Sequence, residues 1–247
     1  MRLSPRLLAA ACAVCAAPAM SFATVQVDLE LSLLVDVSGS INSAEFNLQR
    51  GGYSAAFRTP GIQSQITSTD NGRLGRIAVN VIYWSGASQQ AEVVPWTLLD
   101  SVASINAFAD AIDATTRQFD GQTSVQGALD FARPRFASNM FDGFRKVIDI
   151  SSDGDNNSLA PGRTVAQARA DTLAQIDTIN ALVIGDTSLL NYYVSNVVGG
   201  DGAFALQAET FEQFRDTIFR KLTFEIPTPG AASLLALAGL VGLRRRR

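Results

Sequence analysis

The segment at residues 31–40 constrains the fold of this chain more than any other stretch. An apolar run at residues 31–35 ends in Asp36-Val37-Ser38-Gly39-Ser40. A nearly continuous apolar run of this length is typical of a strand in the middle of a parallel sheet, where both faces are buried. In an extended chain, residues i, i+2 and i+4 point the same way, so Asp36, Ser38 and Ser40 can direct three oxygen atoms into one pocket.

Two interpretations of this segment stay open when it is taken alone. Hard oxygen donors after a buried strand suit Mg²⁺, which keeps several waters and takes few carboxylates. Asp, Ser and Gly after an apolar strand are also ordinary turn and N-cap residues, and Gly39 allows a tight bend.

Strand-like and helix-like patterns alternate along the rest of the chain. The strands are expected at residues 27–37, 76–84, 90–96, 145–151, 179–184 and 203–207, and the helices at 46–57, 101–114, 125–136, 164–176 and 211–222. Residues 76–84 and 90–96 are expected to form a hairpin, which places the second strand antiparallel at one edge. The alternation predicts an α/β fold with a doubly wound, mostly parallel central sheet of about six strands, flanked by helices.

The two ends of the chain differ from the middle and predict three regions. Residues 1–23 carry two arginines, an apolar run and Ser21-Phe22-Ala23, which is typical of a secretory signal peptide. Residues 24–226 form the folded domain. Residues 227–247 contain Pro227-Thr228-Pro229, a short apolar run and four arginines, which is typical of a sorting signal or membrane anchor. We therefore expect an exported protein in the cell envelope, on the cell surface or outside the cell, held to the membrane at least transiently, and only through this tail.

Composition excludes several kinds of chemistry in the expected domain. The chain has no histidine, and both cysteines, Cys12 and Cys15, lie in the predicted signal peptide. Disulfides, histidine-ligated zinc and nucleophiles activated by histidine are therefore excluded. Without the arginines of the two ends, 14 basic residues face 23 acidic ones, so we expect no nucleic-acid partner.

Two further polar loops are expected beside Asp36, Ser38 and Ser40. Thr123 lies in a Gly-containing loop, and Asp153 follows a predicted strand. In open α/β sheets, ligands bind at the carboxyl ends of the strands. The five residues are candidate Mg²⁺ ligands, with Mn²⁺ or Ca²⁺ as alternative ions. A site with so few direct carboxylates leaves the cation partly uncompensated, so it attracts an anionic ligand such as an Asp or Glu side chain of a partner protein.

These motifs resemble the von Willebrand factor type A (VWA) domains. Their metal-ion-dependent adhesion site has the pattern Asp-x-Ser-x-Ser, matched here by Asp36, Ser38 and Ser40, with a Thr and an Asp in two later loops, matched by Thr123 and Asp153. The resemblance covers about residues 27–222 and implies a Rossmann-like VWA fold with a Mg²⁺ site. Segments such as Tyr83-Trp84-Ser85-Gly86 resemble those of an uncharacterised bacterial subgroup of the VWA domains. The tail resembles Pro-Glu-Pro sorting signals, with Thr228 in place of the Glu.

Three functions remain to be compared. The first, which we favour, is a binding module without enzymatic activity that mediates Mg²⁺-dependent adhesion. The second is a Mg²⁺-dependent phosphohydrolase, disfavoured because Ser38 stands where such enzymes commonly have a second Asp and because neither Lys146 nor Lys221 is well placed for phosphate. The third is a structural envelope or matrix protein whose metal only stabilises the fold.

Two other acidic residues need an explanation. Asp149 interrupts a strand that is expected to be buried, and we favour a structural salt bridge, with Arg76 as the candidate partner, over a functional role. Asp155, Asn156 and Asn157 either extend the candidate site or build a turn, and we favour the turn.

Overall fold

The computed structural model describes residues 24–227. The predicted signal peptide, and all but the first residue of the predicted tail, therefore lie outside the described residues. Within residues 24–227, no helix is long and apolar enough to cross a membrane.

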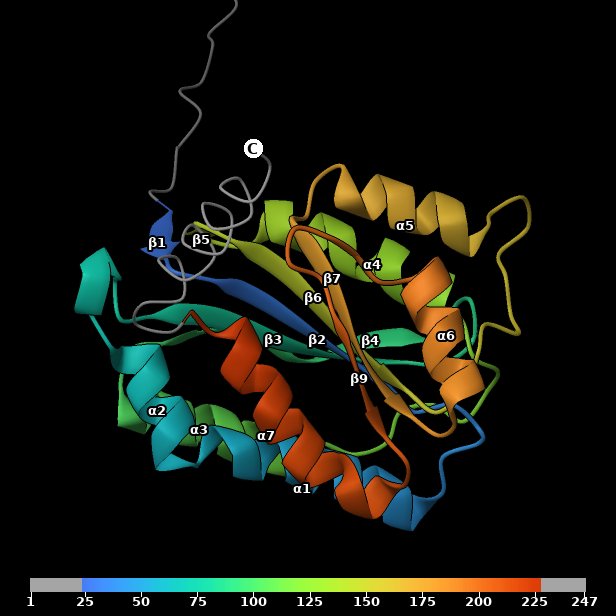
Figure 1. Cartoon of the computed structure of the whole chain (residues 1–247), viewed down its shortest axis with the longest axis horizontal. Coiled ribbons are helices and arrows are strands. Elements are labelled where there is room, and N and C mark those ends of the chain that lie inside the picture. Colours follow the sequence, from blue (N-terminus) through green and yellow to red (C-terminus); the bar gives the residue numbers. More distant parts are fainter. Residues whose placement is uncertain (1–23, 228–247) are drawn as a thin grey trace, which may run out of the picture.

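The centre of the molecule is a seven-stranded sheet with β2 and β6 in its interior (Figure 1). The strand order is β4-β3-β2-β6-β7-β8, and β9 also pairs with β7. The strands are β2 (Glu30–Asp36), β3 (Ile77–Trp84), β4 (Gln90–Leu99), β6 (Lys146–Ser152), β7 (Thr178–Ile184), β8 (Gly199–Gly200) and β9 (Ala205–Ala208). A separate parallel pair joins β1 (Val25–Val27) to β5 (Phe141–Gly143).

The sheet confirms the predicted doubly wound architecture. β2 pairs in parallel with β3 and β6, and β7 pairs in parallel with β6 and β9. β4 is antiparallel to β3 at one edge, as the predicted hairpin requires. The short strand β8 is a second antiparallel strand, beside β7, which the sequence did not predict.

Helices cover both faces of the sheet (Figure 1). One apolar core lies between the sheet and α1, α2, α3 and α7, and a second core lies between the sheet and α4, α5 and α6. The helices are α1 (Ser43–Phe57), α2 (Pro60–Thr67), α3 (Val102–Asp113), α4 (Val125–Ser138), α5 (Val165–Leu173), α6 (Thr187–Asn196) and α7 (Phe214–Glu225), with 3-10 turns η1 (Asp70–Gly72) and η2 (Phe211–Gln213). β2 and β6 are therefore buried on both faces, as their apolar sequences require.

Helix α1 leads directly away from the candidate site and has a well-defined start. The Asn42 side chain accepts hydrogen bonds from the backbone N–H groups of Ala44 and Glu45, and Glu45 accepts one from the N–H of Asn42. This capping box satisfies donors that the first helical turn leaves free. Gly52 faces α7, where an added Cβ would lie 2.8 Å from Cδ1 of Phe214. The glycine therefore permits close packing of the two helices.

The structure corrects the expected partner of Asp149. Arg76 donates through Nε to the carbonyl of Gln26, at 2.8 Å. Asp149 instead contacts the ammonium group of Lys221, which α7 brings onto the sheet. The buried charge is paired, as expected, but with a residue from the other end of the domain.

Candidate metal centre

The first loop of the candidate site begins where β2 ends. Asp36 is fully buried, and its Oδ1 accepts a hydrogen bond from the backbone N–H of Ser38, at 2.8 Å. The hydroxyl oxygens of Ser38 and Ser40 lie 3.2 Å apart. The alternation of an extended chain therefore places these three side chains together, as the sequence predicted.

The second and third loops complete a continuous chain of polar contacts. The Thr123 hydroxyl, just before α4, donates to Oγ of Ser38 at 3.2 Å. The Ser40 hydroxyl donates to Oδ1 of Asp153, just after β6, at 2.7 Å. All five predicted residues therefore meet at the carboxyl edge of the sheet, between the two central strands and the start of α4.

Gly39 is required for close packing between loops. Its N–H donates to the carbonyl of Gly121 at 2.7 Å. A Cβ at this position would lie 2.7 Å from the carbonyl oxygen of Asp120. Real Cβ contacts do not occur at that distance, so only glycine lets the first loop approach the second.

The chemistry of this donor set fits a hard divalent cation. Three hydroxyls and two carboxylates converge, all of them oxygen donors of the kind that Mg²⁺ and Ca²⁺ prefer. Within residues 24–227, no cluster of three or more His, Cys, Asp or Glu residues could hold a metal. The candidate ligands are thus mostly neutral, which would leave a bound cation able to attract an anion.

Both carboxylates of the set carry raised pKa values. Burial raises the pKa of Asp36 to about 7, and the nearby charge of Asp153 adds to the rise, against hydrogen bonds from Ser152 and Ser38 that lower it. Burial also raises the pKa of Asp153, while hydrogen bonding by Ser40 and the charge of Arg117 lower it. A fully buried and a partly buried carboxylate that lie close together are stabilised as anions by a cation between them.

Four residues outside the five candidate ligands hold the loops in place, and the sequence analysis had singled out only one of them, Asn157. Ser152 donates to Oδ2 of Asp36 at 2.5 Å and also contacts the backbone of Gly154. The fully buried Tyr193 of α6 donates through its hydroxyl to the carbonyl of Gly154 at 3.0 Å. Both contacts position the loop that carries Asp153.

Arg117 and Asn157 hold the other two loops. Arg117 donates through Nη2 to the carbonyls of Val37 and Ser38, at 3.1 and 2.7 Å. Asn157 accepts a hydrogen bond from the N–H of Thr123 through Oδ1, at 2.8 Å, and its own N–H donates to the carbonyl of Thr123. The polar run after Asp153 therefore bridges the second and third loops instead of forming a local turn.

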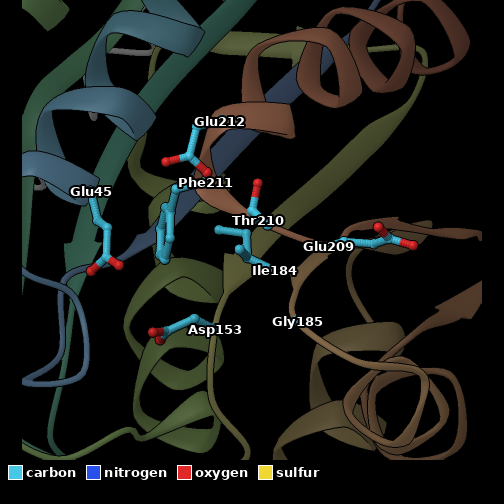
Figure 2. Close-up of a pocket in the computed structure, with 8 residues that line it drawn as sticks. All are labelled: Glu45, Asp153, Ile184, Gly185, Glu209, Thr210, Phe211 and Glu212. Atoms are coloured by element: carbon cyan, nitrogen blue, oxygen red, sulfur yellow. The ribbon is translucent and has the colours of Figure 1, made fainter.

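Two open depressions flank Asp153. The first, of about 340 Å³, is shown in Figure 2 and is lined by Glu45, Asp153, Ile184, Gly185, Glu209, Thr210, Phe211 and Glu212. The second, of about 480 Å³, shares Asp153 and Gly185 and extends toward Tyr192. The carboxylates of Glu45 and Asp153 lie near the ring of Phe211 in Figure 2. Space for a ligand is therefore present directly beside the candidate site.

A protein-family model and solved structures match this chain. The family described as "Protein of unknown function (DUF1194)" matches residues 26–230. No curated protein matches the sequence. The structure is similar to proximal thread matrix protein 1 of the mussel byssus, with a TM-score of 0.56 and 18% identity over 80% of this chain and 46% of that chain.

Two further structures extend the comparison. The same mussel protein with a zinc-occupied MIDAS motif gives a TM-score of 0.51 and 17% identity, over 79% of this chain and 46% of that chain. The pilus adhesin SpaC of Lactobacillus rhamnosus GG gives a TM-score of 0.55 and 12% identity, over 81% of this chain and 30% of that chain. The chain spans about half the length of the mussel protein and less than a third of the adhesin. At these identities the likeness shows the fold alone, and that fold is the predicted VWA fold.

Proposed function

This chain belongs to the DUF1194 family of proteins of unknown function, and on that premise we propose that it is an exported, non-enzymatic VWA module that binds a partner protein through Mg²⁺. Asp36, Ser38, Ser40, Thr123 and Asp153 hold the ion, directly or through water. An Asp or Glu carboxylate of the partner completes its coordination. Mn²⁺ and Ca²⁺ are the alternative ions.

The observation that carries the proposal is the continuous chain of oxygen donors drawn from three loops. Ser38 contacts both Ser40 and Thr123, and Ser40 contacts Asp153. A set of three hydroxyls with two carboxylates leaves positive charge on a divalent ion. The adjoining depressions leave room for a partner side chain to reach that ion.

Metal occupancy in the mussel protein supports the choice of a divalent ion. That protein's structure carries zinc in its MIDAS motif, and its fold is shared by this chain. The adhesive role named for SpaC likewise agrees with a binding module. Both are properties of those proteins, and their transfer to this chain is part of the proposal.

The position of the lysines argues against the phosphohydrolase alternative. Lys221 is fully buried in the interior, and Lys146 begins β6, at the opposite end of the strand from Asp153. Neither lysine can therefore hold a transferred phosphate at the candidate site. The stabilising-metal alternative is separated from adhesion by the experiment below.

Titration calorimetry with Mg²⁺ tests the site, with Asp36→Ala as the loss variant. Asp155→Ala is the matched control, because Asp155 lies in the same loop as Asp153 but outside the hydrogen-bonded chain. We expect the Asp36 variant to lose Mg²⁺ binding and the Asp155 variant to keep it. Equal Mg²⁺ binding by wild type and Asp36→Ala would overturn the proposed site.

A pull-down with Mg²⁺ or chelator, from the envelope and secreted fractions of the host, then tests the role. Metal-dependent capture that Asp36→Ala abolishes supports adhesion. If metal raises the melting temperature but no partner is captured in a metal-dependent way, the site is purely structural.

We further propose that residues 1–23 are removed as a signal peptide and that residues 227–247 act as the sorting tail. N-terminal sequencing of the exported protein should then begin at Thr24.

A further inference from the structure

Three ionisable side chains meet in the interior, away from the candidate metal site. Lys221 and Glu225 lie one turn apart on α7, which packs on one face of the sheet (Figure 1), and Asp149 lies in the middle of β6. The exposed fractions of Lys221 and Asp149 are 0%, and that of Glu225 is 1%. Nζ of Lys221 contacts Oδ1 of Asp149 and lies 2.9 Å from Oε1 of Glu225.

The hydrogen bonding of this cluster does not suit a set of three ions. Nζ of Lys221 touches Asp149, but neither oxygen of Asp149 has a hydrogen-bond partner of normal geometry among the described residues. Oε2 of Glu225 also lacks one, whereas Oε1 accepts from Nδ2 of Asn180 at 2.8 Å. Two carboxylates and one ammonium would place three charges with incomplete hydrogen bonding in a fully buried site, which is costly.

Burial favours the neutral acid form of Asp149. Desolvation raises the pKa of Asp149, and the negative charge of Glu225 raises it further, against the opposing charge of Lys221. Transfer of one proton from the ammonium to this carboxylate gives a neutral amine in contact with a neutral acid. An amine with a free electron pair beside a carboxylic acid, with a second carboxylate at hydrogen-bond distance, is a set of groups competent for amide formation.

We propose that Lys221 and Asp149 condense spontaneously to an intramolecular isopeptide bond, with Glu225 as the catalytic residue that moves the protons. The Nζ electron pair of Lys221 attacks Cγ of Asp149, and an N–C bond forms. Glu225 takes a proton from the nitrogen and gives it to the departing hydroxyl. The Cγ–O bond breaks, and one water molecule leaves. The ammonium and carboxylate become one amide and one water, so atoms and charge balance without any oxidant or co-reactant.

The condensation reduces the number of buried charges in the cluster from three to one. The remaining carboxylate is Glu225, whose Oε1 faces the new amide N–H and already accepts from Asn180. The bond joins the last helix to a central strand and closes the chain between residues 149 and 221. Residues 24–227 contain no cysteine, so this cross-link supplies the covalent bracing that disulfides give to other exported domains.

Mass spectrometry of the full chain under denaturing conditions tests the bond directly. The mass of the cross-linked protein should be lower, by one water, than the mass calculated from the sequence between its N- and C-terminal residues. Trypsin does not cleave after an acylated lysine, so the digest should contain residues 147–163 joined to a peptide that begins at Lys221. Glu225→Gln keeps the shape of the side chain but cannot move protons, so we expect it to lose the cross-link and to melt at a lower temperature.

Lys146→Arg is the matched control, because Lys146 lies on the same strand but outside the cluster, and it should cross-link as the wild type does. Full-mass wild-type protein, with residues 147–163 recovered as a free peptide, would overturn the bond. A Glu225→Gln variant that still loses water would overturn the catalytic role of Glu225. Because the mass of the wild type is read without any substitution, variants that do not fold leave the test intact.

Discussion

Two pairs of carboxylates lie in or against the same sheet, and they are compensated in different ways. Asp149 and Glu225 face the ammonium of Lys221, which the chain itself supplies. Asp36 and Asp153 are joined instead through Ser38, Ser40 and Ser152. β6 carries Asp149 in its middle, and Asp153 follows just beyond its end.

The difference shows where the group that compensates each acidic cluster comes from. The interior cluster is sealed between β6 and α7, so the group that compensates its carboxylates, Lys221, has to be part of the sequence. The edge cluster opens onto two depressions and can take its positive charge from solvent. An acidic pair in the interior therefore serves the fold, whereas an acidic pair at the strand ends is available to a ligand.

Removal of the Lys221 side-chain nitrogen should have the largest effect. Lys221→Met prevents the proposed cross-link and leaves two buried carboxylates without a counter-charge, and the missing counter-charge alone typically costs about 3–5 kcal/mol of the free energy of unfolding. Lys146→Met is the control: Lys146 is 29% exposed, and its Nζ lies 3.9 Å from Glu30. The control should cost less than about 1 kcal/mol. Urea denaturation at neutral pH measures both, and equal losses would contradict the comparison.

The loss in Lys221→Met should depend on pH. In the folded state the pKa of Asp149 is raised from 3.8 to about 7, so the folded protein binds this proton more tightly than the unfolded chain does. Stability therefore falls as the pH rises through this window and is lowest above it. The charge of Lys221 lowers the pKa of Asp149, so its removal extends this pH range upward. Urea midpoints at about pH 5 and about pH 8 should differ in the variant, whereas the wild type, with Asp149 held in an amide, should change less.

Addition of metal should stabilise the edge cluster and leave the interior cluster unchanged. At a Mg²⁺ concentration about 100 times the dissociation constant, binding to the folded state alone adds about 2.7 kcal/mol. Thermal melts with Mg²⁺ and with chelator should show this gain in the wild type and in Glu225→Gln, but not in Asp36→Ala. A gain that persists in Asp36→Ala would place the ion elsewhere.

Two glycine-to-alanine substitutions should distinguish close packing between the first and second loops from the general effect of alanine on backbone stability. Gly39→Ala puts a Cβ 2.7 Å from the carbonyl oxygen of Asp120, and such overpacking costs about 1–3 kcal/mol. Gly51→Ala in α1 meets nothing within 4 Å and should stabilise the protein by up to about 1 kcal/mol. Denaturation midpoints that move in opposite directions confirm that the loops pack tightly. A shift of the same sign in both variants would contradict it.

The sequence predicted the edge cluster well and the interior cluster poorly, for physical reasons. Apolar runs locate strands, and polar residues that follow them must meet at one edge, so Asp36, Thr123 and Asp153 could be placed together. The partner of Asp149 depends on how α7 is rotated and docked, which no local pattern encodes. Arg117 and Tyr193 escaped notice for the same reason, since they act through contacts with distant backbone carbonyls. Helix α6 had a usable signal in its N-cap, Asp186, which accepts from the N–H of Leu189.

The smallest effect expected comes from two tyrosines that reach the end of β6 from opposite faces. Tyr193 of α6 donates to the carbonyl of Gly154, and Tyr53 of α1 donates to Oγ of Ser151, at 3.0 and 3.3 Å. Each substitution to Phe removes one buried hydrogen bond, for a loss of about 1 kcal/mol. Of the two tyrosines, Tyr193 is the one that holds the loop of Asp153, so Tyr193→Phe should also weaken Mg²⁺ binding, by up to about tenfold. Titration calorimetry on the two variants measures the difference. If Tyr53→Phe weakens Mg²⁺ binding equally, the two clusters are coupled through β6 and are not independent.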